Sequence, residues 1–139
     1  MEESLNIENV NALTLAYLGD AVFELSVRDH FMKTGSQKVE KLHKRVTAFV
    51  NAKSQSELFS VIEPHLTEAE LSVYHRGRNS KTVTAAKNQK ISDYRRATGF
   101  EAVFGYLYLK GESGRIRELL SLCFAKEAAA EETMPQENP

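Results

Sequence analysis

Two short acidic motifs hold the residues best suited to chemistry. They are LGDAVFE at residues 18–24 and GFEAVFG at residues 99–105. Each sets a carboxylate, Asp20 or Glu101, in an apolar run, where desolvating even an unpaired polar group costs about 2–7 kcal/mol. No basic residue stands beside either acid, so a divalent metal held between them would satisfy both. The alternative is that each acid is solvated at a helix edge or paired with a nearby lysine.

Magnesium suits two carboxylates, because it keeps several waters and needs only one or two protein ligands besides substrate phosphate. At such a site it would polarise a phosphoryl oxygen, activate a water for in-line attack, or stabilise the leaving oxygen. Glu24 lies one helical turn after Asp20 on the same stripe, as either a support for the metal ligands or a structural residue. The four histidines lack metal-ligand spacing, and no serine has the context of a covalent nucleophile.

Positive charge is concentrated between the two motifs. Residues 75–96 hold seven basic side chains and one acid, although the whole chain has a net charge of −1. Such a segment is either a phosphate-binding surface or a solvated loop. It is rich in donors and poor in aromatics, which favours phosphate and 2′-hydroxyl contacts to duplex RNA over stacking on unpaired bases. The candidate RNA-binding residues are Arg76, Arg78, Asn79, Lys81, Lys87 and Lys90.

The composition is that of a soluble globular domain. The 139 residues are 42% hydrophobic and 27% charged, with no apolar run of membrane-spanning length and no signal-peptide pattern at the start. The single cysteine, Cys123, excludes an intrachain disulfide and is typical of a reducing compartment. We therefore expect a cytoplasmic protein without membrane contact. The expected organisation is a flexible segment at 1–8, a catalytic domain at 9–131 and a disordered tail at 132–139.

The hydrophobic spacing predicts an all-α fold of about six helices and no convincing strand. The expected helices cover residues 9–33, 36–51, 53–63, 67–77, 92–110 and 113–130, with a long irregular connection at 77–91. Ser36, Ser92 and a Thr67–Glu70 capping box are the expected start signals, and Gly111 is an expected stop. Several large side chains are expected on buried faces, among them Leu13, Tyr17, Val39 and Tyr108.

Two features concern how the motifs are positioned. Gly19 lies inside the first expected helix at a cost of about 1 kcal/mol relative to alanine, which suggests close backbone packing at this point. The helix that carries Glu101 has an apolar arc too wide for one contact face. It is therefore expected at the centre of the core or shared with a second subunit.

The first motif resembles the signature helix of the ribonuclease III family, whose core is Leu-Gly-Asp-Ala-Val. The second resembles the same family's second acidic helix, and the separation between the motifs fits one catalytic domain. Within the family, the stretches YHRGRNSK at 74–81 and YRRATGFE at 94–101 are similar to the short Mini-ribonuclease III branch. The resemblance covers residues from about 10 to 125.

This resemblance implies the ribonuclease III endonuclease-domain fold and a homodimeric, magnesium-dependent endoribonuclease that cleaves double-stranded RNA. Manganese is the expected substitute metal. The implied substrate is precursor 23S ribosomal RNA, matured at its 5′ and 3′ ends, and a ribosomal protein is a further partner to consider. Asp20 and Glu101 match the family's essential acids, which implies that they are catalytic metal ligands. No separate RNA-binding domain fits after residue 131, so the basic segment is expected to bind RNA.

The sequence departs from the larger members of the family at several acidic positions. Leu13 and Ala16 stand where those enzymes have acids before the aspartate, and Thr98 stands where they have an aspartate before the glutamate. In a looser alignment, Lys53 replaces a further acid. These changes leave few ligands and favour one metal held by Asp20 and Glu101.

Two functions of other classes stay open at this point. One is a non-catalytic double-stranded RNA-binding factor for ribosome assembly, which would use the same basic segment. The other is a helical protein adaptor whose basic segment is only a solvated surface. Retention of both acids argues against the first, and the salt dependence of RNA binding would separate the second.

Overall fold

The computed structural model describes residues 5–35, 38–80 and 90–133. In this part of the chain the fold is all-α, as predicted, with six α-helices and no strand. The helices are α1 (Ala12–Thr34), α2 (Val39–Phe49), α3 (Ala52–Ile62), α4 (Glu68–Arg78), α5 (Ile91–Leu109) and α6 (Ser113–Thr133). Two short 3₁₀ turns, η1 (Ile7–Asn9) and η2 (Glu63–His65), precede α1 and α4. None of the described helices has the length and apolar character needed to cross a bilayer.

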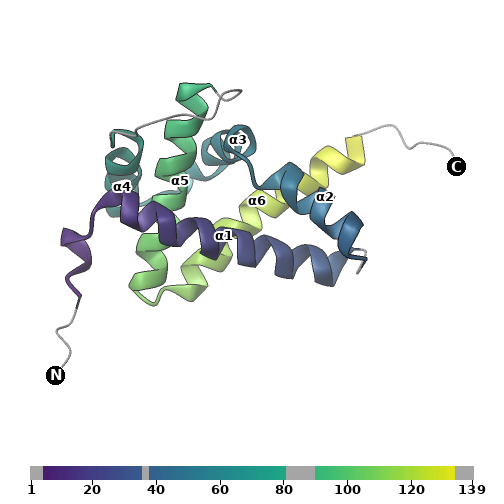
Figure 1. Ribbon diagram of the computed structural model, residues 1–139, viewed down its shortest axis with the longest axis horizontal. Helices are drawn as coiled ribbons and strands as arrows, with labels where there is room; N and C mark the ends of the chain where they lie inside the picture. Colours follow the sequence, from purple (N-terminus) through teal and green to yellow (C-terminus); the bar gives the residue numbers. More distant parts are fainter. Residues whose placement is uncertain (1–4, 36–37, 81–89, 134–139) are drawn as a thin grey trace, which may run out of the picture.

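Helix α5 lies at the centre of the molecule. Helices α1, α3, α4 and α6 all pack on it, and the N-terminal part of α1 crosses the C-terminal half of α5 (Figure 1). Five of its side chains have no exposed surface: Phe100, Ala102, Val103, Phe104 and Leu107. This confirms the prediction of a central helix, because a helix that is apolar on most sides needs neighbours on most sides.

The crossing of α1 and α5 depends on two glycines. A Cβ atom added to Gly19 would lie 1.7 Å from the carbonyl oxygen of Glu101, and one added to Gly105 would lie 1.9 Å from the carbonyl oxygen of Leu15. Both distances are far below any real contact, so the two backbones touch directly at this point. The close packing predicted at Gly19 is therefore confirmed.

A cluster of phenylalanines sets how α1 is rotated on α5. The ring of Phe23 packs edge-on against Phe100, with 5.1 Å between ring centroids, and lies 5.6 Å from the ring of Phe104. On its other side it stacks on Phe49 of α2 at 5.9 Å. With Gly19 one turn earlier on the same face, Phe23 fixes which side of α1 is turned toward α5.

Some predicted helix boundaries were right and others wrong. The Thr67–Glu70 capping box is present, and Gly111, with φ of 73°, follows the end of α5 in the left-handed region. Ser92 is not a cap, because α5 already begins at Ile91. Ser36 lies outside the described residues, and α2 begins after Lys38 without a side-chain cap bond.

Four side chains expected in the core are exposed instead. The exposed fractions of Leu13, Tyr17, Val39 and Tyr108 are 37, 84, 74 and 56%. For α1 the reason is the glycine crossing, which turns the stripe through Leu15 and Gly19 toward α5 and leaves the neighbouring stripe outside. The rotation of a helix is set by its tightest contact, which a wide apolar arc alone does not reveal.

Candidate active site

The α1–α5 crossing brings Asp20 and Glu101 together. Each acid lies next to a backbone contact, since Asp20 follows Gly19 and the carbonyl of Glu101 faces Gly19 itself. The two carboxyl groups are in hydrogen-bonding contact. Glu101 is half-buried, whereas Asp20 is exposed. The expectation that both acids lie in apolar surroundings therefore holds for Glu101 and is wrong for Asp20, because its side of α1 faces away from the core.

The electrostatics of the pair oppose a second negative charge. Burial, the hydrogen bond with Asp20 and the charge of Asp20 together raise the pKa of Glu101 to about 9, while a bond from Gln55 acts in the opposite direction. At neutral pH the metal-free pair therefore keeps a proton, with the protonated Glu101 carboxyl donating to Asp20. A divalent cation between the two groups would replace this proton.

Gln55 is the third member of the site and was missed by the sequence reasoning. Its side chain is buried on α3, and its Nε2 donates to Oε2 of Glu101 at 3.4 Å. Its place in the sequence pattern could have indicated a buried role, because Gln55 falls on the core-facing stripe of α3 together with Ala52, Phe59 and Ile62. A polar residue at an apolar position indicates a buried partner.

The chemistry of the two acids suits a divalent cation that prefers oxygen ligands. Within the described residues, neither Asp20 nor Glu101 forms an ion pair, and no group of three or more His, Cys, Asp or Glu side chains is placed to hold a metal. Because Asp20 is exposed, waters and a phosphate oxygen could complete the coordination of a cation held by the two carboxylates. Magnesium prefers this combination of one or two carboxylates, waters and phosphate.

Two nearby polar residues, Glu24 and Thr98, have partners of their own. Glu24 forms an ion pair with Arg28, with 2.8 Å between Oε2 and a guanidinium nitrogen, so the suggestion that it supports the metal ligands stays a prediction. Thr98 is buried and its hydroxyl donates to the carbonyl of Tyr94 at 2.9 Å. This bond turns the side chain back along its own helix and away from a role as a ligand.

The candidate RNA-binding residues fall into three groups. Arg78 and Asn79 are exposed at the C-terminal end of α4, and Lys90 is exposed just before α5. Arg76 donates to the carbonyl oxygen of Val10 at 2.8 Å, so it also anchors the segment that leads into α1. The two remaining predicted residues, Lys81 and Lys87, lie outside the described residues.

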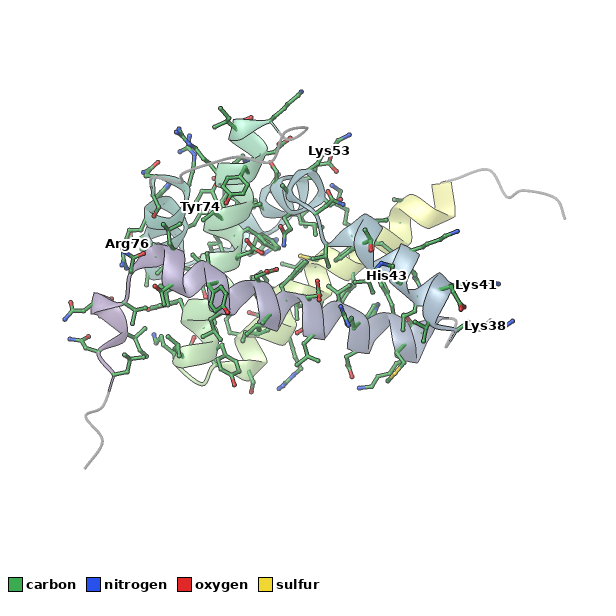
Figure 2. All side chains as sticks on the ribbon, viewed as in Figure 1. Lys38, Lys41, His43, Lys53, Tyr74 and Arg76 are labelled. Carbon is green, nitrogen blue, oxygen red and sulfur yellow. The ribbon has the colours of Figure 1, made fainter. Side chains whose placement is uncertain are left out.

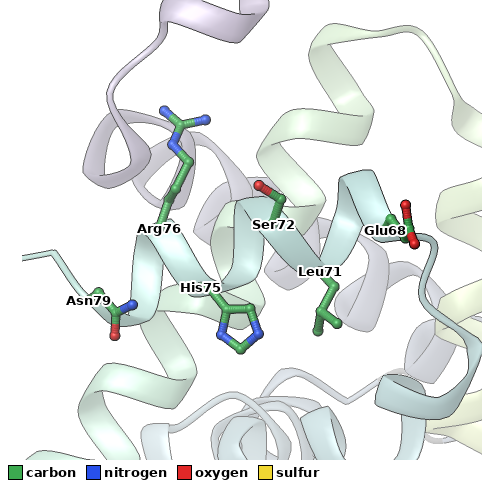
Figure 3. A pocket seen from close by; sticks show the side chains of 6 residues that line it. All are labelled: Glu68, Leu71, Ser72, His75, Arg76 and Asn79. Atoms are coloured by element: carbon green, nitrogen blue, oxygen red, sulfur yellow. The ribbon is translucent and has the colours of Figure 1, made fainter.

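A shallow pocket follows the exposed side of α4. Its lining includes Ser72, His75, Arg76 and Asn79, with Glu68 at the far end (Figure 3). Figure 2 shows Arg76 beside the start of α1. Lys38 and Lys41, at the start of α2, lie at the opposite end of the molecule. The basic side chains of α4 therefore form a surface separate from those of α2.

Helix α4 is joined tightly to the helix that carries Glu101. A Cβ atom on Gly77 would lie 2.9 Å from Cα of Gly99, and one on Gly99 would lie 2.6 Å from the Tyr74 ring. Tyr74 stacks on Phe59 of α3 with 3.6 Å between ring centroids. The exposed donors of α4 are thus held in a fixed relation to the acid pair.

The chain is similar to a known family along most of its length. Residues 13–112 match the model of the ribonuclease III domain. With both acidic motifs inside that match and the two acids paired at the α1–α5 crossing, the chain belongs to the ribonuclease III family, whose members are endoribonucleases.

Its relatives define the branch of that family. The chain is 47% identical to Mini-ribonuclease 3 of Clostridium tetani over 84% of this chain and 78% of the relative. It is 47% identical to Mini-ribonuclease 3 of Brevibacillus brevis over 83% of this chain and 86% of the relative. A crystal structure of a Fusobacterium nucleatum protein matches with a TM-score of 0.77 and 32% identity, covering 87% of this chain and 97% of that one. The resemblance to the Mini-ribonuclease III branch is confirmed.

Proposed function

We propose that this protein is a magnesium-dependent, homodimeric endoribonuclease of the cytoplasm that cuts double-stranded RNA and matures the 5′ and 3′ ends of precursor 23S ribosomal RNA. The observation that carries the proposal is the contact between Asp20 and Glu101. Two acids that share a proton in the metal-free chain form a site whose surplus negative charge is suited to a divalent cation. Manganese, with the same preference for oxygen ligands, is the expected substitute.

Asp20 and Glu101 would hold the metal, and Glu101 would first release its proton. When bound, magnesium supplies charge neutralisation at a phosphate and a water that is easier to deprotonate. The exposed position of Asp20 leaves the pair accessible to a phosphodiester. The half-buried Glu101 is held by packing and by Gln55, so one ligand is rigid and the other is accessible.

RNA binding is assigned to the donors around the C-terminal end of α4. Arg78, Asn79 and Lys90 are exposed there, and Lys81 and Lys87 belong to the segment between them in sequence. A mixture of cations and amides suits phosphate and 2′-hydroxyl contacts across an A-form minor groove. Arg76 contributes charge while its bond to Val10 holds the N-terminal segment.

A second copy is proposed to pack near the exposed side of α1. Leu13 and Tyr17 are one turn apart and exposed on the same stripe as Asp20. A two-fold dimer that covers them would set its two sites close to each other. Each site would then act on one strand, which gives a staggered double cut.

The assignment to ribosomal RNA, with a ribosomal protein as an additional partner, is supported by the resemblance to the Mini-ribonuclease III branch. The proposed RNA contacts suit a duplex but do not distinguish one duplex from another. Cleavage of a precursor 23S fragment in preference to an unrelated duplex of equal length would support this part of the proposal. Equal rates on both would contradict it.

The function is tested by incubating the purified chain with end-labelled duplex RNA, with and without magnesium. The expected result is cleavage on both strands only when magnesium or manganese is present. Tight duplex binding without cleavage at any concentration of either metal would favour the non-catalytic assembly factor. No affinity for the duplex at low salt would favour the protein adaptor.

A further inference from the structure

Gln55 occupies a position where an apolar residue is the default. Its side chain is 3% exposed, and its neighbours on the same stripe of α3 are Ala52, Phe59 and Ile62. A buried amide without a partner costs free energy, so this residue needs a bond to be tolerated here. The bond that the structure records is the one from Nε2 to Oε2 of Glu101, at 3.4 Å.

The donor that faces Glu101 is neutral, and this matters as much as its position. A lysine or arginine facing Glu101 would form an ion pair and compete with a divalent cation for the same carboxylate. An amide donates to one carboxylate oxygen, adds no charge and leaves the other oxygen free. Groups that bond to a ligand in this way orient the ligand and strengthen the metal site.

We propose that Gln55 is a positioning residue of the metal site: its neutral amide holds one oxygen of Glu101 and orients the carboxylate for a divalent cation shared with Asp20. The proposal rests on the proposed function, which supplies the metal. It extends that function to a third helix, since α3 then joins α1 and α5 in building the site. The stack of Phe59 on Tyr74 holds α3 in place for this role.

The direct test is a calorimetric titration of the full, metal-free chain with MgCl₂ in the absence of RNA. Gln55→Met keeps the length of the side chain but removes the donor, and Gln55→Asn keeps the amide but withdraws it by one methylene. Each is expected to raise the Kd for magnesium by about tenfold or more. Ser56→Ala, at a neighbouring buried position of α3, is the matched control and is expected to leave Kd unchanged.

A second readout separates positioning from a purely structural role. The magnesium concentration that gives half-maximal cleavage is expected to rise in the Gln55 variants in parallel with Kd. A structural role would lower the melting temperature without moving either magnesium value. Gln55→Lys, which places a cation against Glu101, is expected to weaken magnesium binding further than Gln55→Met.

The outcomes distinguish this inference from the proposed function. Folded Gln55 variants that bind magnesium as tightly as the parent chain would overturn the role of Gln55 and leave the proposed function intact. Parental magnesium affinity in Gln55→Lys alone would overturn it equally, because this variant lacks the amide that the proposal requires. If the parent chain itself binds no magnesium and cuts no duplex, the proposed function fails.

Discussion

Asp20 and Glu101 are in contact because Gly19 lets the backbone of α1 touch the backbone of α5 beside Glu101 itself. The residue that permits the crossing immediately precedes one acid and faces the other. The position of the acids is therefore a direct consequence of the tightest contact in the fold. Any change that separates the two helices also separates the two carboxylates.

Gly19→Ala is expected to destabilise the protein by about 3 kcal/mol or more, because the added Cβ cannot fit against the carbonyl of Glu101 without moving a helix. Urea denaturation measures this change. Gly114→Ala is the matched control, since the nearest atom to its added Cβ is 3.7 Å away on a flexible arginine. Equal stability of Gly19→Ala and the parent chain would show that α1 and α5 can separate freely.

Glu101→Gln is expected to stabilise the metal-free protein at pH 8 by about 1–3 kcal/mol. The pKa of Glu101 is raised to about 9 in the folded chain from an ordinary value of 4.5. Below pH 4.5 the group is protonated whether the chain is folded or not. As pH rises from there toward 9, the unfolded chain releases a proton that the folded chain keeps, so stability falls.

The measurement is the free energy of unfolding with a chelator present, from pH 4 to pH 9. The parent chain should lose stability relative to Glu101→Gln as the pH rises across this interval. Magnesium at pH 8 should stabilise the parent chain alone, which would reduce the difference in unfolding free energy between the two proteins. A constant difference at all pH values would contradict the shared proton.

Glu70→Gln is expected to cost about 2–4 kcal/mol at pH 7, because it removes the charge from a buried pair. Arg115 contacts both oxygens of Glu70 at 2.8 Å. Burial opposes ionisation of Glu70, but the bonds from Arg115 and the Thr67 backbone outweigh it and hold the pKa of Glu70 below its usual value. This stabilisation is complete above pH 4.5 and is lost as pH falls through the lowered pKa.

Urea denaturation of both chains at pH 7 and at pH 3 checks the Glu70 prediction. The difference in unfolding free energy should shrink at the lower pH. A difference of the same size at both pH values would mean that the charge of Glu70 contributes nothing beyond its hydrogen bonds.

Arg78→Gln is expected to weaken duplex RNA binding and to flatten the dependence of log K on log salt by about 0.9, the value for one lost phosphate contact. Fluorescence anisotropy at several salt concentrations measures both effects. Arg117→Gln, at an exposed position on α6, is the control and should change neither. If the two variants behave alike, the end of α4 is not a specific RNA contact.

The sequence predicted those features that depend on residues close to one another. The Thr67–Glu70 capping box is local, and the wide apolar arc around Phe100 and Phe104 is visible within one helix. The role of Gly19 could also be inferred, because a glycine inside a strongly predicted helix needs a reason.

The features that were missed depend on long-range packing. Gln55 meets Glu101 only because α3 packs on α5, and nothing in the spacing of α3 names its partner. Tyr17 was expected in the core because the apolar arc of α1 is wide, and only the contact at Gly19 shows which part of that arc is covered. The bond from Arg76 to Val10 likewise joins segments that the sequence separates.

The most direct test of the acid pair is cleavage of labelled duplex RNA by purified Asp20→Asn. Since Asp20 is exposed and Asn has nearly the same shape, the variant is expected to keep the parental fold and RNA affinity. Its magnesium-dependent cleavage is expected to fall on the order of a thousandfold or more, because one of the two proposed metal ligands is lost. Cleavage at the parental rate by folded Asp20→Asn would contradict the assignment of Asp20 and Glu101 as the active site.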